Sequence, residues 1–132
     1  MIAWTPTLSV GLKEIDDQHK EWFRRAGAFV DGIDHRTAEE TSALLNYLRS
    51  YSQMHFAAEE SLMRDLKYPG YLGHKAQHER FIRDIEKLSA QHRRADLEPM
   101  RVAALLGCWM TDHVSLTDQQ LALFVSARPR SA

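Results

Sequence analysis

The chain has 132 residues, of which 44% are apolar and 27% charged, with a formal net charge of −1. These values are typical of a globular protein, so we expect one domain over residues 1–132. Acidic and basic residues are interspersed without a basic block, which argues against a nucleic-acid-binding surface.

In the N-terminal half, apolar residues recur at steps of three and four over residues 12–35 and again over residues 38–66. This period predicts two amphipathic helices with one buried face each. Thr37 followed by Glu40 has the spacing of a capping box. We therefore expect the second helix to begin directly after Thr37.

In the C-terminal half, the sequence KYPGY at 67–71 interrupts the helical period, which resumes over residues 71–92. A fourth segment begins near Asp96, its stripe reaches His113, and a short tail, SLTDQQLALFV, follows. Four helices joined by short connections predict an all-α fold. The expected architecture is an antiparallel up-down four-helix bundle with a short N-terminal arm.

The sequence also bears on location. The opening MIAWTPTLSV lacks the basic and apolar regions of a secretory signal, and no apolar run has the length of a membrane-spanning helix. The single cysteine, Cys108, has no partner in the chain for a disulfide, which fits a reducing compartment. We expect a cytoplasmic protein that binds neither membranes nor nucleic acids.

Six residues that can bind metal ions lie on the apolar stripes and not on the solvent faces. They are His19, His55, Glu59, His74, His78 and His113. Burying a carboxylate is costly unless its charge is compensated, and no basic residue shares these stripes. A lone inward histidine is more often a hydrogen-bonded core residue. His74 and His78, however, are spaced i,i+4, which places two ring nitrogens within reach of one metal ion.

The donor set limits the kind of metal site. Imidazole-rich sites suit iron, zinc, copper or nickel, and this set is too large for one tetrahedral zinc ion. Two ions bridged by carboxylates would use all of it. The motif HKAQH lacks the glutamate of zinc proteases, and the chain contains no Glu-x-x-His pair of the ferritin-like kind. His35 and His92 lie near helix C-termini, so we expect them on the surface.

The order of these residues resembles the hemerythrin family, above all its single-domain bacterial members. The resemblance rests on VGLKEIDDQHKEWF around His19, HFAAEE at 55–60, KYPGYLGHKAQHERF at 67–81 and HVSLTD at 113–118. It covers nearly the whole chain and implies a four-helix bundle with a non-haem di-iron centre. It also adds Asp118, which the helical period does not select and which a loop past the fourth helix would return to the site.

The resemblance also implies a role for each residue. His74, His78 and His113 would bind one iron, His19 and His55 the other, and Glu59 and Asp118 would bridge the two. With a bridging hydroxide or oxide, one coordination position stays open for O2, on the iron that has two histidines. The expected function is reversible O2 binding by a carrier, store or scavenger that is not an enzyme. The alternatives are a di-iron oxidoreductase or peroxidase, and an O2 sensor module that acts through a partner.

Reversible O2 binding requires an apolar pocket, because water or a proton donor at the open position would make the reaction irreversible. The candidate pocket residues are Trp22, Phe23, Phe56, Phe81, Trp109 and Met110. Many family members have leucine at the position of Met110. Tyr51 is the one candidate proton donor on the stripes. Glu60 lies about 100° around the helix from Glu59, so we expect it to be an ordinary surface acid.

Overall fold

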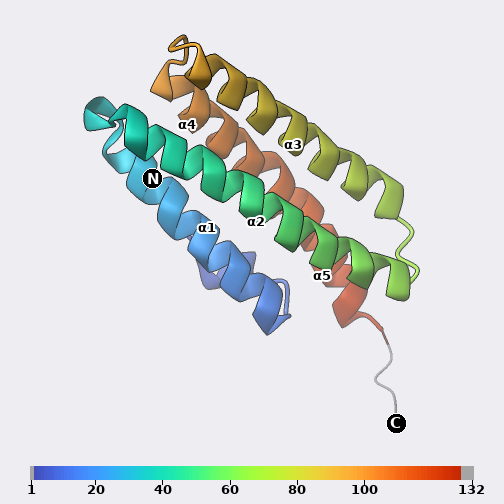
Figure 1. Cartoon of the computed structure of the whole chain (residues 1–132). Helices are drawn as coiled ribbons and strands as arrows, with labels where there is room; N and C mark the ends of the chain where they lie inside the picture. Colours follow the sequence, from blue (N-terminus) through green and yellow to red (C-terminus); the bar gives the residue numbers. More distant parts are fainter. Residues whose placement is uncertain (1, 129–132) are drawn as a thin grey trace.

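The computed structural model describes residues 2–128, which form the expected antiparallel up-down four-helix bundle (Figure 1). The first three long helices are α1 (Lys13–Asp31), α2 (Ala38–Asp65) and α3 (Tyr71–Arg93). The fourth is a rod of three consecutive parts, α4 (Pro99–Cys108), the π-helical segment η3 (Trp109–Thr117) and α5 (Asp118–Ser126). Two short 3-10 helices, η1 (Pro6–Leu8) and η2 (Ile33–His35), lie before and after α1. No helix in the described part of the chain is both long and apolar enough to span a membrane.

The predicted helix boundaries are close to the observed ones, with two differences. The first segment ends at Asp31, because the chain leaves the helix at Gly32 before the short turn η2. The sequence after His113, expected to be a tail, is helical through Ser126. The fourth rod is therefore much longer than the apolar stripe indicated.

The start of α2 confirms the predicted capping box. The Glu40 amide donates to the Thr37 hydroxyl oxygen at 3.1 Å, and the Thr37 amide donates to the Glu40 carboxylate at 3.3 Å. These two bonds satisfy amides that the first turn of a helix leaves without partners. From this start, α2 runs for 28 residues without a proline or glycine.

Helices α2 and α3 end in the same way, on a left-handed residue that is not glycine. Lys67 follows α2 with φ 54°, and Ala95 follows α3 with φ 56°. After Lys67, the amide of Tyr68 donates to the carbonyl of Met63 at 2.9 Å, and an equivalent bond follows Ala95. These bonds satisfy carbonyls at the helix end, but the left-handed conformation strains a residue that has a Cβ atom.

The N-terminal arm lies back along α1. A Cβ atom on Gly27 would stand 2.7 Å from the carbonyl oxygen of Ile2, so the close approach of the arm requires glycine there. Farther along the arm, the carbonyl oxygen of Leu8 accepts a hydrogen bond of 3.0 Å from the side chain of Gln119 in α5. The arm therefore connects α1 to the last helix of the bundle.

The interior of the bundle has two ends of different character. Because neighbouring helices are antiparallel, the first halves of α1 and α3 meet the second halves of α2 and of the fourth rod (Figure 1). We call this the site end, because it contains every predicted metal ligand. The opposite, apolar end is built from buried Ala26, Phe29, Leu44, Leu45, Leu48, Ile85, Val102 and Leu106.

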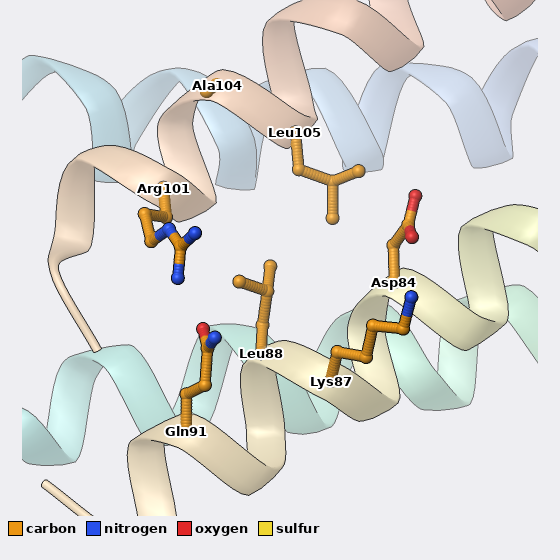
Figure 2. Close-up of a pocket in the computed structure, with 7 residues that line it drawn as sticks. All are labelled: Asp84, Lys87, Leu88, Gln91, Arg101, Ala104 and Leu105. Carbon is orange, nitrogen blue, oxygen red and sulfur yellow. The ribbon is translucent and has the colours of Figure 1, made fainter. Parts of the chain in front are cut away.

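A groove separates α3 from α4 on the outside of the bundle, away from the predicted ligands (Figure 2). Leu88 and Leu105 face each other across it, and its volume is about 290 Å³. The remaining lining residues are Asp84, Lys87, Gln91, Arg101 and Ala104. The groove therefore has an apolar middle with charged and amide groups around it.

Candidate metal centre

All seven predicted ligand residues meet inside the site end, and each is at most 2% exposed. They come from all four long helices: His19 from α1, His55 and Glu59 from α2, His74 and His78 from α3, His113 from η3 and Asp118 from α5. The i,i+4 spacing places each pair from α2 and α3 on one helix face. The bundle then turns these faces toward one another.

Glu59 contacts histidines on both sides of the cluster. Its Oε1 lies 3.0 Å from His74 Nε2 and 3.1 Å from His78 Nε2. Its Oε2 lies 3.0 Å from His55 Nε2 and 3.8 Å from His19 Nε2. One carboxylate oxygen therefore faces each group of histidines.

Asp118 divides its two oxygens in the same way. Its Oδ1 lies 3.0 Å from His113 Nε2 and 3.1 Å from His74 Nε2, whereas its Oδ2 lies 3.4 Å from His19 Nε2. The ring nitrogens thus form a group of three and a group of two, with both carboxylates between them. Two sets of these residues are close enough to hold a metal ion each. One consists of Glu59, His74, His78 and His113, and the other of Glu59, His19 and His55. In each set, every residue offers one ligand atom, and these atoms all lie within 4.8 Å of one another.

The prediction that a loop returns Asp118 to the site was wrong, because the π-helical segment η3 places it there. In an α-helix, residues five apart point about 140° away from each other. Here the amide of Asp118 donates to the carbonyl of His113, five residues earlier. Bonding at this interval puts the two residues one above the other on the same face of the rod.

Two glutamines hold two of the ligand rings from behind. His55 Nδ1 donates to Gln18 Oε1 at 2.5 Å, and His113 Nδ1 donates to Gln77 Oε1 at 2.8 Å. With the proton on Nδ1, the lone pair of each Nε2 points into the cluster. Sequence reasoning missed both glutamines. Each stands directly before a ligand histidine of its own helix but bonds to a histidine of another, so only helix packing reveals the pairing.

The prediction that Glu60 is an ordinary surface acid was also wrong. Its side chain is only 16% exposed, and its Oε2 accepts a hydrogen bond from His78 Nδ1 at 2.9 Å. The rotation of about 100° from Glu59 turns this side chain toward α3, where it stays partly exposed to water. Glu60 therefore supports a ligand ring from the outer side.

The inward atoms fit metal ions better than they fit one another. Within the described residues, His78 Nε2, His113 Nε2, Glu59 Oε2 and both oxygens of Asp118 have no hydrogen-bond partner. Leaving buried polar atoms without partners costs free energy. Ligand atoms about 2.1 Å from one metal ion and at right angles to each other lie about 3.0 Å apart. The closest contacts between nitrogen and carboxylate oxygen here are 3.0 Å.

The charges in the cluster require a cation. Burial raises the pKa of Glu59, but the facing histidines hold it well below its ordinary value. Burial and the nearby Glu59 raise the pKa of Asp118. His113 and His74 lower it by more, so that the net pKa is about 2. Both carboxylates are therefore ionised.

The histidines respond differently to the two carboxylates. Burial lowers the pKa of His19 and of His113. Burial also lowers the pKa of His74, but the carboxylates of Asp118 and Glu59, 3.1 Å and 3.0 Å from its Nε2, outweigh this effect and raise it to about 9. A proton on His74 thus partly balances the carboxylates, and a metal ion must compete with it.

Aromatic rings cover the side of the cluster with three histidines. The Phe56 ring stacks on His78 with a centroid distance of 3.9 Å, and Trp109 stacks on His113 at 3.8 Å. Phe81 packs against Trp109 at 4.2 Å. These contacts fix the planes of two ligand rings and surround them with apolar atoms.

The other candidate pocket residues have different surroundings. Trp22 and Phe23 are 1% and 2% exposed and contact each other edge to face, whereas Met110 is half-buried against the core. Tyr51, considered only as a proton donor, stacks on His55 at 4.8 Å. Burial raises the pKa of the Tyr51 hydroxyl well above its ordinary value. The Tyr51 ring, which lies beside the group of two histidines, is therefore a phenol that keeps its proton.

The two histidines left out of the site lie away from it. His35 is exposed in the short turn after α1. His92 is half-buried, and its Nε2 lies 2.7 Å from Ser42 Oγ and 3.1 Å from the Ala38 carbonyl oxygen. It therefore connects the end of α3 to the start of α2 at the apolar end.

Comparisons with known proteins agree with this arrangement. Residues 10–124 match the model of the hemerythrin HHE cation binding domain. A bacteriohemerythrin of Pseudomonas aeruginosa is 27% identical over 117 residues, which cover 89% of this chain and 76% of that protein. A bacteriohemerythrin of Stenotrophomonas maltophilia is 25% identical, with coverages of 96% and 83%. A myohemerythrin of Sipunculus nudus is 31% identical, with coverages of 88% and 87%.

Proposed function

The chain belongs to the hemerythrin family, and we propose that its buried cluster holds two non-haem iron ions and binds O2 reversibly. One observation carries this proposal. The nitrogens form a group of three and a group of two, and each of two carboxylates directs one oxygen to each group. A single metal ion would leave part of this set unused.

The proposed ligands follow from these contacts. His74, His78 and His113 would hold one iron, His19 and His55 would hold the other, and Glu59 and Asp118 would serve both, together with a hydroxide or oxide. The iron pair would supply the exchangeable electrons on which reversible O2 binding depends. The protein contributes a fixed ligand geometry, two negative charges and a site closed to bulk water.

Because one group has three histidines and the other has two, we propose that O2 binds on the side of His19 and His55. Besides the His19 ring, Tyr51 and Phe56 contact the His55 ring, with centroid distances of 4.8 Å and 5.9 Å. We include Trp22, Phe23, Phe81, Trp109 and Met110 in the apolar surroundings that keep water away. A cytoplasmic location and the absence of nucleic-acid partners stay predictions from the sequence.

A second candidate function is a di-iron oxidoreductase or peroxidase, and Tyr51 is the observation that favours it. Its ring stacks on His55, so a phenol that keeps its proton lies beside the proposed O2 side. A proton donor there is what an oxidoreductase or peroxidase would need and what a reversible O2 carrier must avoid. The Tyr51→Phe variant separates the two functions, because it removes the proton and keeps the ring.

The test is metal analysis followed by spectroscopy of the reduced protein. We expect two irons per chain and a visible charge-transfer band that appears with O2 and disappears when O2 is removed. Glu59→Ala should lose the iron pair. His92→Ala, which removes a histidine outside the cluster, should keep it. One zinc ion per chain would refute the proposal, and irreversible bleaching that Tyr51→Phe prevents would favour the enzyme.

A further inference from the structure

Two ligand rings on opposite sides of the cluster are supported by the same kind of group. In each, a ring Nδ1 donates to the amide oxygen of a glutamine, His55 to Gln18 and His113 to Gln77. A glutamine oxygen is neutral, so it orients the ring without adding charge. These two bonds therefore give each proposed iron one histidine with a neutral outer partner.

The other three rings break this equality. His78 Nδ1 donates to the carboxylate of Glu60, whereas the Nδ1 atoms of His19 and His74 have no partner within residues 2–128. The cluster thus has a single anionic outer partner among these bonds, on the side with three histidines. Gln119 follows Asp118 as Glu60 follows Glu59, but its amide bonds to the N-terminal arm.

A carboxylate behind an imidazole changes what the ring offers to a metal ion. It attracts the Nδ1 proton, which makes the opposite Nε2 more basic and adds negative charge near the ion. Both effects favour the more highly charged state of the metal. Glu60 is 16% exposed, whereas Glu59 is 1% exposed, so water reaches the outer carboxylate and supports its charge.

We propose that Glu60 is a positioning residue that makes the two irons electronically unequal, lowering the reduction potential of the one bound by His74, His78 and His113. This inference rests on the proposed di-iron function. It assigns the easier oxidation to the iron that has three histidines, away from the side proposed for O2. Its basis is one charged hydrogen bond in a set whose other two members are neutral.

A purely structural role must be separated from this one, because the bond joins Glu60 on α2 to His78 on α3. The Glu60→Gln variant does so. Its amide oxygen can still accept from His78 Nδ1, as the oxygen of Gln77 accepts from His113. Only the charge changes, so a simple connection between helices predicts no electronic effect.

The first measurement is the reduction potential of the iron-loaded protein, with iron content as a control. For Glu60→Gln we expect two irons per chain and a more positive potential for one of them. The equilibrium constant for its one-electron reduction should rise about tenfold, which corresponds to about 59 mV. Gln77→Glu, which adds a carboxylate behind His113, should shift the potential of the same iron in the opposite direction. Unchanged potentials in Glu60→Gln would overturn the proposal.

The second measurement is Co²⁺ binding to the metal-free protein, which needs neither O2 nor iron. Loss of an outer partner typically lowers metal affinity 10–100-fold. We expect Glu60→Ala to weaken one of two Co²⁺ sites by this factor, and Gln18→Ala to weaken the other. Equal weakening of both sites by Glu60→Ala would show a structural role and overturn the proposal. A normal O2 spectrum alongside unchanged potentials would refute only the role of Glu60, whereas failure to bind two metal ions would refute the proposed function.

Discussion

The two ends of the bundle are built from the same helices but are stabilised by different forces. At the apolar end, residues such as Leu48, Val102 and Leu106 are completely buried, and each buried apolar side chain contributes about 1.5–3 kcal/mol. At the site end, Glu59 and Asp118 are buried as ions, which costs free energy unless a cation compensates them. We infer that the apolar end holds the helices in register, and that metal ions complete the site end.

Removing the metal should change the stability of the two ends most. A ligand present at a thousand times its dissociation constant adds about 4 kcal/mol to the free energy of unfolding. We expect urea denaturation to show a loss of this size per site after chelation. Amide hydrogen exchange should accelerate around His74 and His113 and stay slow around Leu48 and Val102. Equal acceleration at both ends would contradict the proposed division of roles.

A cavity at the apolar end should have the next largest effect. Leu106→Ala removes a fully buried side chain, so we expect a loss of about 2–5 kcal/mol in the free energy of unfolding. The loss should be similar with and without metal, because the site lies elsewhere in the bundle. Leu105→Ala, at a half-buried neighbour, is the control and should cost less. A loss of metal from Leu106→Ala would show that the two ends are coupled.

The smallest effect concerns the two strained helix ends, one at each end of the bundle. Lys67→Gly and Ala95→Gly replace left-handed residues whose Cβ atoms cost about 1–2 kcal/mol, partly offset by the greater freedom of glycine when unfolded. We expect each variant to raise the free energy of unfolding by up to about 1 kcal/mol in thermal denaturation. The two gains should be alike, because the strain is local. A fall in stability would show that these side chains make contacts that outweigh it.

Several parts of the centre could be predicted from single helices. The i,i+4 pairs His55–Glu59 and His74–His78 lie on apolar stripes, so the helical period alone turned them inward. Asp118 could not be found in this way, because its alignment with His113 depends on π-helical bonding and not on the α-helical period. The family resemblance supplied the residue, but the loop expected to carry it does not exist.

The outer partners could not be predicted, because each hydrogen bond joins two helices. Gln18 precedes His19 yet bonds to His55, and Glu60 looked solvent-facing on an isolated helix yet bonds to His78. The sequence by itself determined which residues face inward, because helical period and polarity are local properties of the chain. Only the tertiary structure decided which histidines face the same carboxylate and which ligand ring bonds to the carboxylate of Glu60. Both depend on how the four helices are rotated against each other.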